Sequence, residues 1–182
     1  GYPPVGRPSV IGIGQSLGGG LLIYQQARHG GFDGIGVLGF SAIHAHPSTP
    51  PGGEPVVVAW YPRDASLEEC REPLIARGID PDVALPAWYA HRTPQRAARS
   101  SLTPGVVASE AAAIDVPVLA AMGVRDLVPD PHNEPRAYAS ARSVDVFVCP
   151  RMGHMHNMAG TRALLWERIH LFGEWCAAMK GQ

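Results

Sequence analysis

A serine flanked by glycines is the residue pattern with the clearest chemical meaning in this sequence. The pentapeptide GQSLG at 14–18 matches G-x-S-x-G, and it follows a short β-branched run at 9–14 that suits a buried strand. On a sharp turn between a strand and a helix, a serine hydroxyl is lifted above the sheet and can act as a nucleophile. We predict that Ser16 is this nucleophile. We also predict that Gly14 and Gly18 are required, because a side chain at either position would collide where strand and helix pack closely.

The segment after Ser16 predicts a helix whose N-terminus points at the nucleophile. Unpaired N–H groups and the positive end of a helix favour a developing oxyanion, so the Leu17 N–H is a candidate oxyanion donor. Two other glycine-rich sites fit poorly. A dinucleotide site would need a third glycine where Leu17 stands, and a phosphate-binding P-loop would need a lysine, which is absent there.

A serine nucleophile needs a base, and the base needs a carboxylate to orient it. The apolar run at 117–123 is followed directly by the tripeptide that ends at Asp126, and the run at 144–149 by the pentapeptide that ends at His154. Both residues would lie in loops at the carboxyl ends of later strands. The chain order serine, acid, histidine therefore predicts Asp126 as the acid and His154 as the base.

Each of these two assignments has a competitor nearby in the sequence. Asp130 also follows the third apolar run, but the prolines on both sides of it indicate a turn role, so Asp126 is favoured. His156 lies close behind His154 and is the alternative base.

Apolar runs alternate with helical patterns along the chain. Strand candidates lie at 9–14, 35–40, 117–123 and 144–149. Near-continuous apolar strands of this kind are typical of a parallel sheet with helices on both faces, so we predict an α/β fold. We expect the four strands to follow chain order across the sheet, with the first strand presenting an unpaired edge.

Three segments have the spacing of helices. One runs from Leu17 to the glycines at 30–31, a short one covers 134–141, and the last begins near Thr161. The apolar stripes are formed in the first helix by Leu17, Leu21, Tyr24 and Ala27 or Arg28, and in the last by Leu165, Ile169, Phe172, Cys176 and Met179.

The stretch 44–113 interrupts this alternation. It is rich in proline and contains two Trp-Tyr pairs, at 60–61 and 88–89. Long structureless loops are uncommon in compact domains, so we predict that this stretch is a lid or cap insertion. The chain then divides into core residues 1–43, the insertion 44–113 and core residues 114–182.

Composition excludes several classes of partner. The 182 residues are 46% hydrophobic and 17% charged, as in one ordinary globular domain. The 15 basic and 16 acidic residues leave a formal charge of -1 without a basic stripe, so nucleic acid is not an expected partner. No apolar run approaches the roughly 20 residues that span a bilayer.

The cysteines, Cys70, Cys149 and Cys176, match no disulfide or zinc pattern; we interpret the last two as buried free thiols, in keeping with a cytoplasmic protein.

We predict no metal or other cofactor. The alternative is a two-metal site built from His44-x-His46 and His154-x-His156. It lacks a third cluster of ligands, and it would make the serine motif accidental.

Three stretches carry a resemblance to a known family. SVIGIGQSLGG resembles the nucleophile elbow of the α/β-hydrolase fold family, MGVRDLVPD resembles its acid turn, and PRMGHMHN with the helix after it resembles its histidine loop and final helix. The resemblance implies the C-terminal part of an α/β-hydrolase fold, a Ser16–His154–Asp126 triad, and hydrolysis of an ester or similar acyl bond. Because the family places the base directly after a glycine, it favours His154 and makes His156 a polar neighbour of the site.

The sequence departs from the family pattern ahead of Ser16. The family has several strands before the nucleophile strand, and the loop after one of them supplies the second oxyanion donor. Here only residues 1–8 precede the first strand candidate. We therefore expect this chain alone to be a poor enzyme, and we expect added N-terminal strands to raise its activity.

Other functions on the same fold stay open. One is a non-catalytic fragment or binding module, and another is an acyltransferase or perhydrolase that uses the same serine. Serine in place of aspartate at the nucleophile position speaks against the dehalogenase and epoxide-hydrolase members of the family. The aromatic pairs and prolines of 44–113 indicate an apolar wall, so we expect the partner to be a small, uncharged or weakly charged ester with a modest acyl group.

Overall fold

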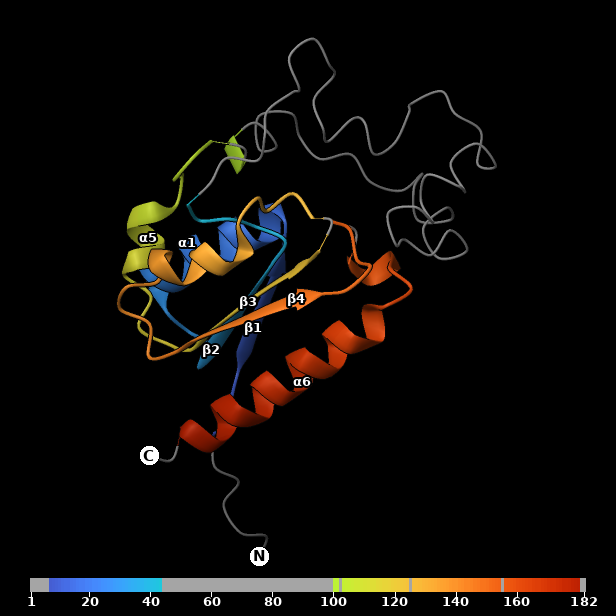
Figure 1. Ribbon diagram of the computed structural model, residues 1–182. Coiled ribbons are helices and arrows are strands. Elements are labelled where there is room, and N and C mark those ends of the chain that lie inside the picture. The colour runs from blue at the N-terminus through green and yellow to red at the C-terminus, as the bar shows by residue number, and fades with distance from the viewer. Residues whose placement is uncertain (1–6, 44–99, 102, 125, 155, 181–182) are drawn as a thin grey trace, which may run out of the picture.

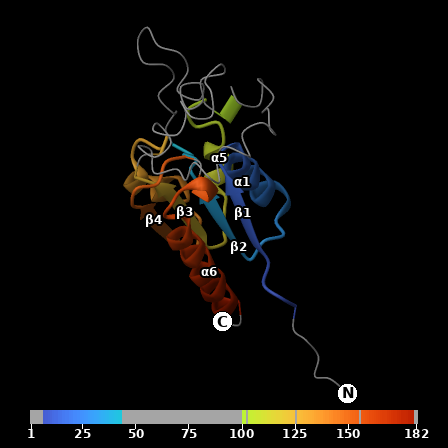
Figure 2. The same cartoon turned by 90° about the vertical axis from the view of Figure 1, so that its right-hand side faces the viewer.

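Four parallel strands form the centre of the computed structural model, which describes residues 7–43, 100–101, 103–124, 126–154 and 156–180. The strands are β1 (Ile11–Gln15), β2 (Gly34–Leu38), β3 (Val118–Gly123) and β4 (Val144–Cys149). Each strand pairs in parallel with the next one along the chain, so β1 and β4 are the two edges of this sheet (Figure 2). The predicted parallel sheet and its strand order are confirmed.

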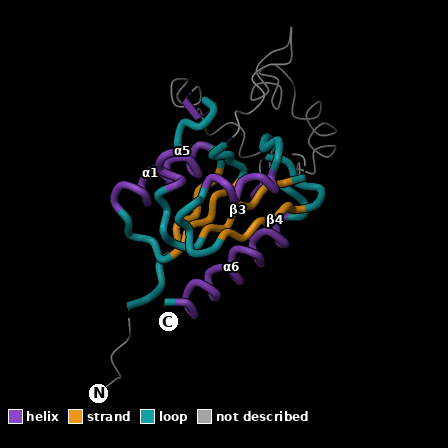
Figure 3. Tube along the Cα trace, turned by 60° about the vertical axis from the view of Figure 1, so that its left-hand side comes forward, coloured by secondary structure: helices purple, strands orange, loops and turns teal. Residues whose placement is uncertain are grey.

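Helices cover both faces of the sheet (Figures 1 and 3). One face carries α1 (Leu17–His29), α5 (Ala108–Ala112) and the 3-10 helix η2 (Pro131–Ala137). The other face carries α6 (Arg162–Met179), which is preceded by the short 3-10 helix η3 (His156–Met158). Because helices cover both of their faces, β2 and β3 are buried along their whole length, which is why their sequences are almost entirely apolar.

Among the described residues, the two largest apolar clusters join these layers, one on each face of the sheet. The cluster beneath α1 and α5 includes Ile23 and Val37, and neither side chain is exposed to solvent. The cluster beneath α6 includes Leu119, Leu165 and Phe172. Burying a side chain of this size contributes about 1.5–3 kcal/mol relative to leaving it exposed. The strand ends that carry the candidate site are therefore held from both faces.

The predicted first helix forms as α1, but its buried face differs from the predicted apolar stripe. Leu21 and Tyr24 are 61% and 48% exposed, whereas the two apolar residues at 22–23 are buried. The difference arises from the glycines at 19–20, which let the helix backbone pack directly against the Phe40 side chain. A helical pattern of apolar side chains does not include glycines, but in α1 the glycines lie on the buried face.

The last helix follows its predicted stripe except at the C-terminal end. Leu165, Phe172 and Cys176 are buried, Ile169 is partly buried, and Met179 is 38% exposed. Cys176 and Cys149 are free and buried, as expected for the described part of the chain.

The short helix predicted at 134–141 is instead the 3-10 helix η2, which begins and ends earlier. Pro131 stands at its start and Pro135 lies inside it. A proline has no N–H and cannot close an α-helical hydrogen bond, so the segment does not form a regular α-helix and takes the tighter 3-10 geometry instead.

Most of the predicted insertion, including both Trp-Tyr pairs and His44-x-His46, lies outside the described residues. Its last residues form α5, which packs against α1. The Arg28 guanidinium donates to the Glu110 carboxylate at 2.7 Å, and Ala111 is buried in the core. α5 is thus part of the helical layer over the sheet.

None of the helices that the structure describes combines the length and the apolar character that a membrane span requires.

Candidate active site

Ser16 occupies a strained turn between β1 and α1. Its backbone has φ 54° and ψ -127°, a conformation that a residue with a side chain rarely adopts. Neighbouring hydrogen bonds hold the turn in place: the Ser16 N–H donates to the Leu38 carbonyl at 2.8 Å, and the Gly19 N–H donates to the Ser16 carbonyl at 2.8 Å. The strain is therefore imposed by β2 and by the first turn of α1, and it leaves the hydroxyl beyond the end of β1.

The two glycines of the serine motif are not equivalent. A Cβ atom built on Gly14 would lie 2.3 Å from the carbonyl oxygen of Gly18, a backbone atom that cannot move aside cheaply. A Cβ atom on Gly18 would have no neighbour within 4 Å. The prediction that both glycines are required is therefore wrong for Gly18, because its Cα–Cβ direction points away from the strand.

This asymmetry predicts opposite results for two alanine substitutions. Gly14→Ala should lower the free energy of unfolding by about 1–3 kcal/mol or more, because the strand and helix must separate. Gly18→Ala should be neutral or raise it by up to about 1 kcal/mol, because alanine favours a helix over glycine. Urea denaturation of both variants measures the difference. Equal destabilisation by the two substitutions would contradict the geometry of the turn.

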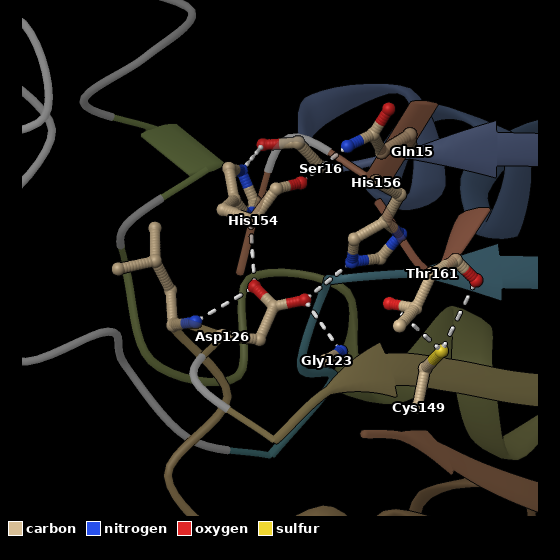
Figure 4. Close-up of polar contacts among 9 residues, drawn as sticks. Gln15, Ser16, Gly123, Asp126, Cys149, His154, His156 and Thr161 are labelled. Atoms are coloured by element: carbon tan, nitrogen blue, oxygen red, sulfur yellow. Dashed lines mark hydrogen bonds and ion pairs between the residues drawn. The ribbon is translucent and has the colours of Figure 1, made fainter. Parts of the chain in front are cut away.

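The structure brings Ser16, His154 and Asp126 together at the carboxyl ends of three strands (Figure 4). His154 Nε2 lies 2.7 Å from Ser16 Oγ, and His154 Nδ1 lies 2.7 Å from Asp126 Oδ1. The His154 side chain is 9% exposed and that of Asp126 is fully buried. An ionised carboxylate only accepts hydrogen bonds, so Nδ1 carries the proton and Nε2 accepts from the serine hydroxyl.

Four donors from the described residues surround the Asp126 carboxylate. Oδ1 accepts from His154 and from the Leu127 N–H at 2.7 Å, while Oδ2 accepts from the Gly123 N–H at 3.1 Å and from His156 Nε2 at 2.5 Å. Burial alone would raise the pKa of Asp126, but the hydrogen bonds from the two histidines outweigh it and hold the pKa well below its ordinary value of 3.8. The group is therefore a carboxylate at neutral pH.

The competing assignments lie elsewhere. Asp130 is exposed and stands at the N-cap position of η2, consistent with the predicted turn role. His156 is buried and reaches Asp126 rather than the serine. It is a polar neighbour of the site, as expected, but no sequence pattern indicates which atom it contacts.

No family model matches the chain, and no curated protein matches it. Comparison of folds does find similar structures. The esterase RhEst1 from Rhodococcus sp. ECU1013 superposes with a TM-score of 0.57 at 18% identity, over 90% of this chain and 64% of that one. The 2-hydroxy-6-oxo-6-phenylhexa-2,4-dienoate hydrolase BPHD from Rhodococcus sp. strain RHA1 gives 0.54 at 16% identity, over 88% and 62%. The meta-cleavage product hydrolase CumD, known from Pseudomonas fluorescens IP01, gives 0.54 at 18% identity, over 91% and 65%.

All three are hydrolases built on one fold, and their likeness extends over most of this chain. The chain has the α/β-hydrolase fold. It spans 62–65% of the length of these three structures. At such low identity the likeness concerns the α/β-hydrolase fold itself, and the chemistry has to be argued from the site.

Within this α/β-hydrolase fold, two further residues position the histidine loop. The Gln15 side-chain amide donates to the His154 carbonyl at 2.5 Å, which ties the loop to the end of β1. Thr161 Oγ1 donates to the Pro150 carbonyl at 2.9 Å, which ties the other end of the loop to the start of α6. Neither contact was predicted. The only sequence signal for Gln15 is a polar side chain at the end of an apolar strand.

The predicted oxyanion donor lies where the motif places it, in the first residue of α1. None of the hydrogen bonds among the described residues uses the Leu17 N–H. The described part of the chain also holds no group of three or more residues arranged to bind a metal ion. The His44-x-His46 half of the alternative metal site lies outside the described residues.

Proposed function

We propose that this protein is a serine hydrolase that cleaves an ester or similar acyl bond through an acyl-enzyme intermediate. The observation that carries the proposal is the continuous hydrogen-bonded chain from Ser16 Oγ through both nitrogens of His154 to the buried Asp126 carboxylate. Hydroxyl, imidazole and carboxylate in this order form the arrangement that activates a serine nucleophile. The strained backbone at Ser16 and the hydrolases among the structural neighbours support it.

In the first half of the reaction, Ser16 Oγ attacks the carbonyl carbon of the substrate while its proton passes to His154 Nε2. The Leu17 N–H, at the positive end of α1, would donate to the oxyanion that forms. Asp126 holds His154 in the required tautomer and stabilises the imidazolium. The bond to the leaving alcohol then breaks, and that alcohol takes the proton from His154.

In the second half, water replaces the alcohol. His154 Nε2 takes a proton from the water molecule as the water oxygen attacks the acyl carbon. The same proton passes to Ser16 Oγ when the bond between Ser16 Oγ and the acyl carbon breaks. The products are a carboxylic acid and the free enzyme. Every proton transfer passes through one nitrogen of His154, which explains why that ring must be fixed by its other nitrogen.

Hydrolysis of a short-chain p-nitrophenyl ester tests the proposal. We expect an initial burst of p-nitrophenolate that does not exceed one equivalent of enzyme, followed by slower steady turnover, because with this good leaving group the acyl-enzyme forms faster than it is hydrolysed. Release of p-nitrophenolate at the rate of buffer alone would contradict the proposal.

A further inference from the structure

The second oxygen of the Asp126 carboxylate has an imidazole of its own. His156 Nε2 lies 2.5 Å from Asp126 Oδ2, and the His156 side chain is 1% exposed. Figure 4 shows the carboxylate between the rings of His154 and His156. The two ring centres are 6.2 Å apart and the ring planes are inclined by 69°. The proposed mechanism uses only one of these rings.

The protonation of His156 follows from its partners. The Asp126 carboxylate accepts hydrogen bonds, so the proton of a neutral His156 must be on Nε2. The other nitrogen, Nδ1, is buried and has no hydrogen-bond partner among the described residues. A second proton on Nδ1 would be a buried donor without an acceptor, which is costly. His156 is therefore a neutral donor, and its tautomer is the opposite of that of His154.

The backbone beside the contact between Asp126 and His156 leaves no room for a side chain at Gly39. Gly39, at the end of β2, has φ 58°, and a Cβ atom there would lie 3.0 Å from Asp126 Oδ2 and 3.0 Å from His156 Cε1. The His156 N–H donates to the His154 carbonyl at 2.9 Å, so a single tight turn delivers both rings to one carboxylate. The close contact of Asp126, His156 and Gly39 thus involves three separate strand ends.

We infer that His156 is a positioning residue for the reaction, which acts by fixing the Asp126 carboxylate against rotation and by sharing its negative charge. This inference rests on the proposed function. With Oδ2 held by His156 and Gly123, Oδ1 is directed at His154 Nδ1, and that contact in turn aims Nε2 at the serine hydroxyl. Among the described residues, His154 and His156 are the side chains that lower the pKa of Asp126 most, against the rise that burial causes.

Loss of the His156 donor should shift the pH–rate profile in a predictable direction. The Asp126 carboxylate would keep more of its negative charge for His154, and the imidazolium form of His154 would be stabilised. The base would then lose its proton at higher pH, so the midpoint of the acidic limb of the pH–rate profile should rise. A purely structural role would lower the rate without moving this midpoint.

Two substitutions distinguish the effect of the hydrogen-bond donor of His156 from the effect of the volume of its ring. His156→Gln places an amide donor near the position of Nε2, and His156→Leu removes the donor. The rate of Ser16 modification by a fluorophosphonate, and kcat and KM for the p-nitrophenyl ester, are measured against pH. His170→Leu is the control, because His170 is 72% exposed on α6 and remote from the site. Circular dichroism establishes that each variant is folded.

We expect His156→Leu to lower kcat and the modification rate about 10–100-fold with little change in KM, which is the range for a hydrogen bond to a charged group. Its acidic midpoint should rise, while His156→Gln and His170→Leu should stay close to the unsubstituted protein in rate and midpoint. The inference is overturned if His156→Leu retains the full rate, or if His156→Gln is as slow as His156→Leu with no change of midpoint.

A measurement on the unsubstituted protein covers the case in which His156→Leu does not fold. Nitrogen-15 NMR of the histidine rings distinguishes the two neutral tautomers. His156 should carry its proton on Nε2 and His154 on Nδ1. A proton on Nδ1 of His156 would overturn the inference whether or not the protein is active. Failure of the fluorophosphonate to modify the unsubstituted protein would instead overturn the proposed function.

Discussion

Ser16→Ala is expected to lower turnover of the p-nitrophenyl ester about 10⁴–10⁶-fold. In serine hydrolases, removal of the nucleophile alone has an effect of this order, because base and acid then have no hydroxyl to activate. Among the described residues, the substitution breaks one side-chain hydrogen bond, to His154 Nε2. The folded state should therefore persist, and a thermal denaturation curve close to that of the unsubstituted protein would establish this.

Ser109→Ala is the matched control for this result. Ser109 is an exposed serine on α5, and its hydroxyl donates to the Glu110 carboxylate. Its loss should leave ester hydrolysis unchanged. If Ser16→Ala keeps more than about a tenth of the original turnover, another group performs the attack and the assignment of the nucleophile is wrong.

Asp126→Asn is expected to lower kcat about 10⁴-fold, the effect of removing the orienting carboxylate from such a triad. An asparagine amide can donate to His154 Nδ1, which would leave the proton on Nε2 and face the serine hydroxyl with a donor. The amide also has one acceptor atom where the carboxylate has two, so at least one of its four donors loses its partner. Asp130→Asn, at the exposed N-cap residue of η2, is the control and should have no such effect. Comparable losses of kcat in the two variants would contradict the assignment of the acid.

The same substitution should change how stability depends on pH. The folded protein holds the pKa of Asp126 below its unfolded value of 3.8, so the carboxylate contributes stability that is fully present above that value. As pH falls below 3.8 towards the lowered folded value, the unfolded state takes up the proton first and this contribution is lost. Asp126→Asn removes the titrating group. Its free energy of unfolding should therefore fall less steeply than that of the unsubstituted protein on acidification below about pH 4.

The sheet was predictable because its strands are short apolar runs, and the candidate site was predictable because its three residues follow strand ends. β4, at Val144–Cys149, coincides with the predicted run, and the other three strands begin within a few residues of theirs. In a parallel sheet, loops after successive strands meet at one edge, so sequence order alone placed Ser16, Asp126 and His154 near one another.

The features that the sequence did not predict depend on the directions in which individual side chains point. The buried face of α1 contains glycines at 19–20 that a hydrophobic pattern does not register, and Gly18 differs from Gly14 only in the direction of its missing side chain. The contact of His156 with Asp126 requires the tight backbone turn from His154 to His156, just before η3, which brings two rings separated by one residue to the same carboxylate. None of these features has a periodicity that a sequence pattern can detect.

Modification of the protein by a fluorophosphonate, followed by mass spectrometry of its peptides, tests the account most directly. The reagent forms a covalent bond with a serine only when that serine is activated, and it needs no knowledge of the natural substrate. We expect one adduct, on the peptide that contains Ser16, and we expect its rate of formation to fall by several orders of magnitude in His154→Leu, although the serine is unchanged. An adduct on a different residue, or equal rates with and without His154, would contradict the central claim that Ser16 is a nucleophile activated by His154.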